Sequence, residues 1–363
     1  MSVASERSRR ALVIVLAAAL PACGLLGGVR VDAVDTSVQK PANVAAYLAV
    51  SAGDEPVTDL EAKNFHVYEN GQELDARQIQ RTLLSRDAVT HERVLLLVDV
   101  SGHPTPEQRA DYARAAEAFV RKLQASVNVG VRAFDGSPGL KSVGDYARGG
   151  SSLSAAALLK LSSKDESRDL NGAVVAGLTE LDRAAQNSPK PVELGTLVVF
   201  ANGPDLAGRT EPRTLDEMLE KTNHAVIGIV VGPDAGYLGF ARDGVIRAQG
   251  GDTLAIAFEE AGARVAATHA KHYVLSYCSP ARAGTRSVRV EVVHEDKEGH
   301  EHSGSVEFEI DASGFSPGCN SETLPRFEHG KAPATAEGAR VNQSTTSDPG
   351  AVVPPPATGE YAK

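Results

Sequence analysis

One uninterrupted apolar run limits what this chain can fold into. Residues 94–98, Val-Leu-Leu-Leu-Val, do not alternate with polar residues, so they predict a strand that is covered on both faces, as in a parallel α/β sheet. The run ends at Asp99, and Ser101 follows two residues later. Open α/β sheets bind their ligands at the carboxyl ends of their strands. Two oxygen ligands on one tight loop suit a hard cation such as Mg²⁺, whereas the alternative is that Asp99 only caps the following turn.

Further apolar strands alternate with amphipathic helices along the chain. The segments that the pattern predicts as strands of the same sheet are 127–134, 140–143 (an antiparallel edge strand), 194–201, 225–231 and 272–277. The predicted helices are 106–123, 151–161, 169–185, 214–223 and 253–267, and capping boxes at 105–108 and 214–217 mark two of their starts. This alternation predicts an α/β fold with a doubly wound, mostly parallel, Rossmann-like sheet.

The segment 95–103 resembles the first metal-site loop of von Willebrand factor A-type (VWA) domains, whose pattern is Asp-x-Ser-x-Ser. Asp99 and Ser101 match this pattern, whereas His103 stands at its last position. Residues 57–72 are also similar to a small β segment that precedes A-type domains in a family of bacterial secreted proteins and lipoproteins. The resemblance implies a VWA-like sheet with a role in protein–protein interaction or adhesion rather than in catalysis.

The same resemblance assigns two further loops of a metal site. A-type domains add a Thr that precedes a later helix and an Asp that follows a later strand. In this chain Asn202 stands where that Asp is expected, and Arg168 falls at the Thr position, or Ser167 does if the register slips by one residue. The candidate metal residues are therefore Asp99, Ser101 and Asn202.

These departures change the charge of the predicted site. A full site offers two carboxylates to a dication, but Asp99 alone is charged here because Asn202 is neutral. A guanidinium pairs well with a carboxylate and does not deprotonate. We therefore expect a degenerate site in which Arg168 pairs with Asp99 and no Mg²⁺ binds tightly. The alternative is a Mg²⁺-dependent adhesion site of the MIDAS type, with Asp169 or Asp205 recruited as a ligand.

Nothing in the sequence predicts an enzyme. Ser101 and His103 lie two residues apart, without a Gly-x-Ser-x-Gly elbow or a third member, so a Ser/His hydrolase is the least favoured hypothesis. Neither a P-loop nor a Gly-x-Gly-x-x-Gly motif is present. His300 and His302 belong to an acid-rich run at 294–302, for which a solvated hairpin turn is favoured over a transition-metal site.

The first residues have the layout of a secretory signal. A basic stretch precedes the short apolar run 11–20, and the small residue Ala22 comes directly before Cys23. This cysteine resembles that of the bacterial lipobox, which implies cleavage before Cys23 and attachment of the chain to a membrane through lipid on it. The alternative is an ordinary signal peptide that is cut nearby, with Cys23 free.

The other two of the three cysteines are Cys278 and Cys319. Disulfides persist in oxidising compartments, where a secretory signal would direct this chain. We expect Cys278 and Cys319 to form a disulfide that ties the last core strand to the C-terminal segment, the alternative being two buried or free thiols.

Length and charge limit the possible partners and the domain organisation. The 363 residues carry a formal net charge of −10, and this acidic balance argues against a general nucleic-acid binder, which needs a basic face. The predicted organisation is a signal peptide (1–22), a tether (23–42), a small β region (43–90), the VWA-like domain (91–278), a C-terminal β hairpin (279–325) and a disordered tail (326–363).

We therefore predict a lipid-anchored protein of the bacterial cell envelope, on its periplasmic or surface side. Its VWA-like domain is expected to bind a protein partner, whose identity the sequence does not specify. No cofactor is expected, and Mg²⁺ is the one that the alternative hypothesis requires.

Overall fold

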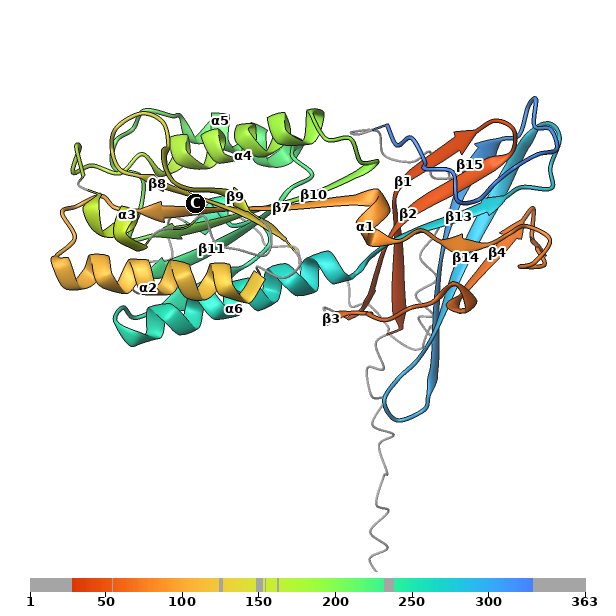
Figure 1. Ribbon diagram of the computed structural model, residues 1–363, viewed down its shortest axis with the longest axis horizontal. Coiled ribbons are helices and arrows are strands. Elements are labelled where there is room, and N and C mark those ends of the chain that lie inside the picture. Colours follow the sequence, from red (N-terminus) through yellow and green to blue (C-terminus); the bar gives the residue numbers. More distant parts are fainter. Residues whose placement is uncertain are drawn as a thin grey trace, which may run out of the picture.

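We describe the protein from a computed structural model, which describes residues 28–53, 55–123, 127–147, 153, 155–161, 163–231 and 238–328. The chain forms an α/β unit and a β-sandwich, which lie side by side in Figure 1. The predicted signal peptide, Cys23 and nearly all of the predicted C-terminal tail lie outside the described residues. Within those residues, no helix is long and apolar enough to cross a membrane.

The α/β unit contains a six-stranded sheet with the order β12-β11-β10-β7-β8-β9. Neighbouring strands are parallel, except that the edge strand β9 runs antiparallel to β8. The strands are β7 (Thr90–Asp99), β8 (Asn128–Phe134), β9 (Lys141–Ala147), β10 (Val192–Ala201), β11 (Ala225–Val231) and β12 (Val245–Ala248). The first strand of the unit is central and the order reverses beside it, as in doubly wound sheets. This confirms the predicted fold class.

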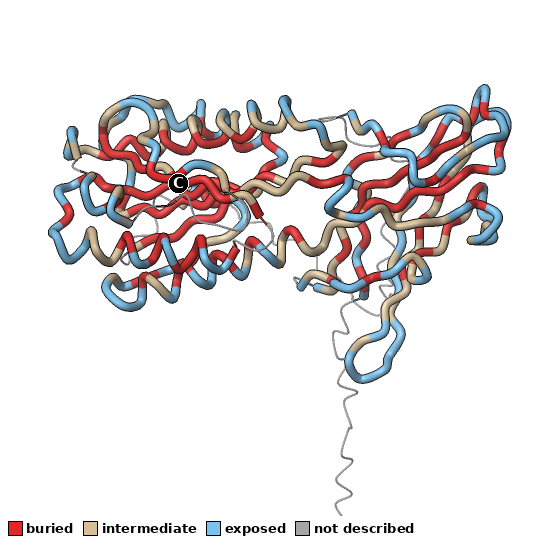
Figure 2. The backbone as a smooth tube through the Cα atoms, viewed as in Figure 1, coloured by how far each residue is buried: buried red, intermediate tan, exposed pale blue. Residues whose placement is uncertain are grey.

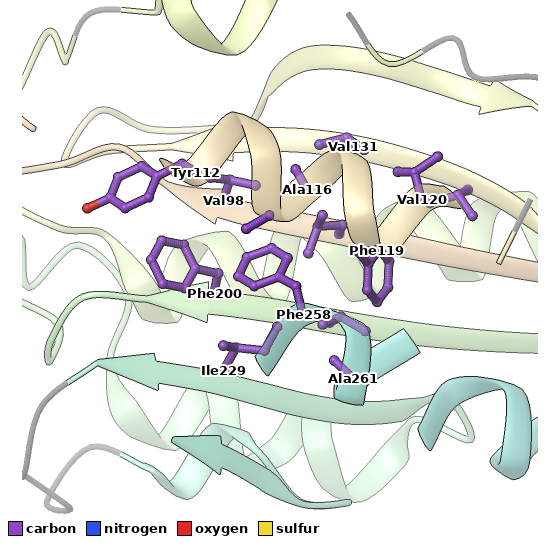
Figure 3. Packing of buried hydrophobic residues seen from close by; sticks show 14 of the residues in the cluster. Val98, Tyr112, Ala116, Phe119, Val120, Val131, Phe200, Ile229, Phe258 and Ala261 are labelled. Carbon is purple, nitrogen blue, oxygen red and sulfur yellow. The ribbon is translucent and has the colours of Figure 1, made fainter. Parts of the chain in front are cut away.

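Helices cover both faces of this sheet. On one face lie α2 (Pro106–Leu123), α3 (Ala155–Lys160) and α6 (Asp252–Ala270), and on the other lie α4 (Leu170–Gln186) and α5 (Pro212–Lys221). Figure 3 shows Phe119, Phe200 and Phe258 packed between the sheet and the first group of helices. Successive residues of β7 point to opposite faces, so Leu96 enters one core and Leu97 enters the other. This two-sided burial explains why the strand is uninterruptedly apolar.

Two predicted helix starts have different outcomes. At α2 the capping box is present, because Thr105 N donates to Gln108 Oε1 (2.8 Å) and Gln108 N donates to Thr105 Oγ1 (3.2 Å). The box predicted at 214–217 is wrong, since α5 already begins at Pro212 with Glu211 as its N-cap. Proline favours the first helical position, and this preference sets the start of α5.

The β-sandwich consists of two mainly antiparallel sheets. One sheet has the order β1-β2-β13-β6 with β3 beside β2, and the other has the order β15-β14-β4-β5. Their strands are β1 (Val29–Gln39), β2 (Asn43–Ala52), β3 (Glu55–Pro56), β4 (Phe65–Glu69), β5 (Gln72–Glu73), β6 (Thr82–Leu83), β13 (His272–Cys278), β14 (Thr285–Glu295) and β15 (Glu301–Asp311), with a short 3₁₀ turn η1 (Ala62–Asn64) before β4. The sheets enclose an apolar core separate from those of the α/β unit, visible as buried segments in Figure 2.

The structure corrects two of the predicted boundaries. The tether predicted at 23–42 contains β1, whose Val29 and Val31 are buried in the sandwich, so the spaced valines belong to a half-buried strand. The strand predicted at 272–277 as the last strand of the central sheet is β13, and it pairs antiparallel with β2. Its Leu275 and Tyr277 complete the sandwich core instead. The sixth strand of the central sheet is β12, which the sequence analysis missed.

These corrections define how the two units are connected. The sandwich is built from residues on both sides of the α/β unit, which is inserted between β6 and β13 through the short helix α1 (Arg86–Val89) on one side and Lys271 on the other. Strand β7 begins at this junction and runs away from the sandwich (Figure 1). Its carboxyl end, with the candidate site, therefore lies at the end of the molecule remote from the sandwich. The predicted disulfide between Cys278 and Cys319 is confirmed, with the two Cα atoms 5.8 Å apart.

Candidate functional site

The candidate site is centred on Asp99, the last residue of β7, whose side chain is inaccessible to solvent. Its Oδ1 atom accepts hydrogen bonds from Ser101 N (2.9 Å) and Ser101 Oγ (2.6 Å). Its Oδ2 atom accepts from Asn202 N (2.9 Å) and from Arg168 Nε (2.5 Å). A carboxylate offers about four lone-pair sites, so the protein already occupies the hydrogen-bonding capacity of Asp99.

Arg168 is the cation of the site. Its guanidinium contacts Asp99 through Nε and donates from Nη1 to the carbonyl oxygen of Pro204 (3.0 Å). The main chain fixes the residue as well, because Arg168 O accepts from Leu206 N and Ala207 N at 2.8 and 2.9 Å. The side chain is nearly buried. The loop after β10 and the start of α4 thus hold the guanidinium against the carboxylate.

Asn202 contributes to the site mainly through its backbone. Its N–H binds Asp99, whereas its Nδ2 lies 3.4 Å from the backbone oxygen of Asp99. Burial raises the pKa of Tyr112, and a side-chain hydrogen bond with Asn202 opposes that rise. The Asn202 amide therefore faces Tyr112 and the β7 main chain, and the three predicted metal residues are brought together at Asp99.

The two acids that the alternative hypothesis recruits are occupied elsewhere. Asp169 is the N-cap of α4, and its Oδ1 accepts from Gly172 N at 3.1 Å. Burial raises the pKa of this carboxyl. Asp205 accepts from Asn171 N (2.9 Å) and Gly208 N (2.8 Å). Both carboxylates therefore shape the loops around the site.

At the candidate metal site, the one charged ligand is already paired with a cation of the chain. Across the described part of the chain, no group of three or more His, Cys, Asp or Glu side chains is arranged to hold one. At the site itself, the Arg168 cation lies 2.5 Å from the one carboxylate that would ligate the ion. Mg²⁺ requires near-octahedral oxygen coordination, which this pairing does not provide.

The residues of the hydrolase hypothesis point to different partners. Ser101 Oγ binds Asp99, whereas His103 Nε2 lies 2.6 Å from Glu166 Oε1 in a pair that is exposed to solvent. No hydrogen bond between Ser101 and His103 is present among the described residues. His300 and His302 contact Asp296 at the tip of the β14–β15 hairpin, at 3.4 and 2.8 Å, which agrees with the predicted turn.

Asp135, an acid that the sequence analysis missed, holds the loop that carries Arg168. Asp135 follows β8 and is buried, and its carboxylate binds Lys141 Nζ (2.5 Å), Lys164 N (2.8 Å) and Ser137 N (2.9 Å). Its backbone oxygen accepts from Asp169 N, next to Arg168. The sequence showed a turn here but no signal that it would hold the loop carrying Arg168.

Asp135 makes one part of the stability dependent on pH. Burial opposes ionisation of this carboxyl, but the hydrogen bonds from Lys141 and from the backbone of Lys164 and Ser137 outweigh it and lower the pKa from 3.8 to about 2. A lowered pKa gives stability that is present above pH 3.8 and is lost as the pH falls through about 2. We expect Lys141→Met to lower the free energy of unfolding by about 1 kcal/mol at pH 7, and by progressively less from pH 4 toward pH 2, in urea titrations.

The matched control for this prediction is Lys164→Met. That substitution removes the same charge but keeps the backbone N–H that binds Asp135, so its effect should be small at every pH. A Lys141→Met effect that does not change with pH would show that Asp135 gains nothing from its charged partner.

With the geometry described, the chain can be compared with known proteins. No family model matches the chain, and no curated protein matches it significantly. A von Willebrand factor type A protein from Catenulispora acidiphila is 13% identical over 79% of this chain and 74% of that chain, with a TM-score of 0.43. Manganese-loaded TRAP protein from Plasmodium vivax is 13% identical over 65% of this chain and 98% of that chain, with a TM-score of 0.39.

A third similar structure is proximal thread matrix protein 1 from the mussel byssus, which is 12% identical over 50% of this chain, with a TM-score of 0.39. The present chain spans about half of that protein, 49% of its length. At such scores the matches say nothing of function. The doubly wound α/β class therefore rests on the strand order and on the helices that cover the sheet.

Proposed function

We propose that the inserted α/β unit is a VWA-like interaction module that binds a protein partner through the loops at the carboxyl end of its sheet, without a metal ion. The observation that carries this proposal is the saturation of Asp99, which accepts four hydrogen bonds, one of them from the Arg168 guanidinium. Because the cation that orders these loops is part of the chain, the binding surface is formed without an external ion.

The surface around the ion pair supports this role. Leu206 lies on the loop after β10, donates its N–H to Arg168 O (2.8 Å), and is 64% exposed. His103, on the loop after β7, and Glu166, on the loop before α4, form a pair with side chains 63% and 72% exposed. Interfaces combine an apolar centre with a polar rim, and these loops offer residues of both kinds.

The second part of the proposal concerns the place of the protein in the cell. We propose that lipid on Cys23 anchors the chain in a bacterial envelope membrane. Five residues separate Cys23 from Val29, the first residue of β1, so the chain length keeps the start of β1 within about 20 Å of the lipid. The site at the far end of β7 is then presented away from the anchored sandwich.

Photo-crosslinking in the cells that make this chain tests the interaction surface. A photoreactive phenylalanine at position 206 is expected to cross-link one discrete protein, and chelation of divalent metals with EDTA should leave the product unchanged. The matched control is position 38 on β1 of the sandwich, where Val38 is 41% exposed. Equal cross-linking from both positions, no product from position 206, or a product that EDTA removes would contradict the proposal.

Fractionation tests the anchor separately. Cys23→Ser is expected to move the protein from the membrane fraction to the soluble fraction of the envelope without changing its thermal stability. A variant that stays with the membrane would contradict the lipid anchor but would leave the interaction surface untouched.

A further inference from the structure

The chain continues after the last sandwich strand as a segment of thirteen residues, 316–328, which we name the C-terminal strap. The strap runs along the sheet that contains β1, β2 and β13. Ser316 N donates to Pro41 O (2.8 Å), Asn43 Nδ2 donates to Asn320 O, and Arg326 N donates to Ser37 Oγ (2.9 Å). The Cys278–Cys319 disulfide fixes its first part to the end of β13.

Phe327, near the C-terminal end of the strap, lies at the junction between the two units. It packs against Tyr47 of β2, with ring centroids 6.0 Å apart. Both belong to a small apolar cluster, distinct from the main cores, whose other members come from both units. These are Leu84, Val89, Val192, Leu194 and Val274.

The other contacts at the junction are mostly polar. Glu92 accepts from Arg86 Nη2 (2.6 Å) and lies 3.0 Å from His269 Nδ1, while His269 Nε2 lies 2.9 Å from Thr196 Oγ1. These residues all belong to the inserted unit and its two connections. Among the described residues, the cluster around Phe327 is therefore an apolar contact in which the strap, the sandwich and the inserted unit meet.

We propose that the strap is a redox-sensitive clasp, which fixes the orientation of the α/β unit on the sandwich by seating Phe327 in the junction while the Cys278–Cys319 disulfide holds its other end. The chain connections between the two units are α1 and the turn at Lys271, which are short enough to act as hinges. Removing the clasp leaves the two units folded but frees their relative motion.

Cys278 and Cys319 border a cavity of about 630 Å³ on the sandwich, lined also by Gln78, Pro280 and Arg282. A small dithiol can release the strap by exchange. Its thiolate attacks one sulfur, the S–S bond breaks, and the displaced cysteine leaves as a thiolate and takes up a proton. The second thiol of the reagent then displaces the other cysteine, so that the dithiol is oxidised and both cysteines are reduced.

Hydrogen exchange of the full chain tests the clasp. Phe327→Ala is expected to raise amide exchange about tenfold in the junction segments 84–92 and 190–196, because local opening there loses its apolar contact, while 225–231 and 288–292 in the two cores stay protected. The matched control is Leu324→Ala, which shortens another strap residue that is 47% exposed and lies outside the junction cluster. Unchanged junction exchange in Phe327→Ala, or an equal rise in Leu324→Ala, would overturn the clasp.

Reduction with dithiothreitol tests the redox part in the same experiment. The expected result is the same rise in exchange at 84–92 and 190–196 as in Phe327→Ala, with 288–292 still protected. Reduction that leaves the junction unchanged would show that the disulfide does not hold the clasp. A loss of protection at 288–292 would also overturn the switch, since the disulfide would then stabilise the sandwich itself.

Discussion

Asp99→Ala is expected to lower the free energy of unfolding of the α/β unit by about 3–5 kcal/mol, because it leaves the buried Arg168 guanidinium without its carboxylate. The backbone N–H groups of Ser101 and Asn202 lose their acceptor in the same step. For a unit of this size the change corresponds to a fall in the melting temperature of about 10 °C. Urea titration followed by circular dichroism measures it.

A double-mutant cycle separates the ion pair from the loss of Asp99 itself. Arg168→Met removes the partner cation, and the double variant removes both charges. We expect the double variant to be more stable than Asp99→Ala alone, since no buried charge is then left unpaired. A double variant whose destabilisation equals the sum of the two single changes would show that Asp99 and Arg168 do not interact energetically.

Phe200→Ala is expected to lower the free energy of unfolding by a similar amount, about 3–5 kcal/mol. Phe200 is fully buried on β10, and its ring lies 5.0 Å from that of Tyr112 and 5.3 Å from that of Phe258 (Figure 3). Truncation opens a cavity between the sheet and the two helices that carry these residues. Equilibrium unfolding in urea measures the loss.

The control for this cavity is Phe200→Leu, which keeps most of the apolar volume and should cost about 1 kcal/mol. If the alanine variant is no less stable than the leucine variant, helices α2 and α6 close over the cavity, and the contact of Phe200 with Tyr112 and Phe258 does not hold this face together. Asn202 lies two residues beyond Phe200, so the alanine variant is also expected to loosen the loop that binds Asp99.

The central sheet could be predicted because the local sequence of its strands indicates that they are buried on both faces. The apolar runs of β7, β10 and β11 are continuous, and only a strand covered on both faces needs that pattern. The pattern does not say to which sheet a strand belongs. The position of residues 272–278 after α6 suggested the central sheet, but long-range pairing with β2 places this strand in the sandwich.

The N-terminal strand β1 was missed for a related reason. Its buried residues include Asp35 and Ser37 besides Val29 and Val31, so the stretch looked polar when each residue was considered alone. Pairing with β2 supplies the hydrogen bonds that stabilise such a strand, and pairing of this kind is not visible in local composition.

The candidate site combines residues that the sequence identified with one that it did not. The resemblance to the A-type loop singled out Asp99, Asn202 and Arg168, and in the structure Asn202 and Arg168 both bind Asp99. Asp135 acts through its backbone oxygen, which binds Asp169, and through its carboxylate, which binds the backbone of Lys164, 29 positions away. A turn sequence carries no information about which distant loop it supports.

Calorimetric titration with Mn²⁺ and Mg²⁺ tests most directly the claim that Arg168 takes the place of a metal ion. The full chain is titrated beside Arg168→Thr/Asn202→Asp, which removes the guanidinium and restores a second carboxylate. We expect no binding to the wild type at low millimolar metal and one bound ion in the double variant. Stoichiometric binding to the wild type in the micromolar to low millimolar range, abolished by Asp99→Ala, would contradict the account and show a working metal-dependent adhesion site.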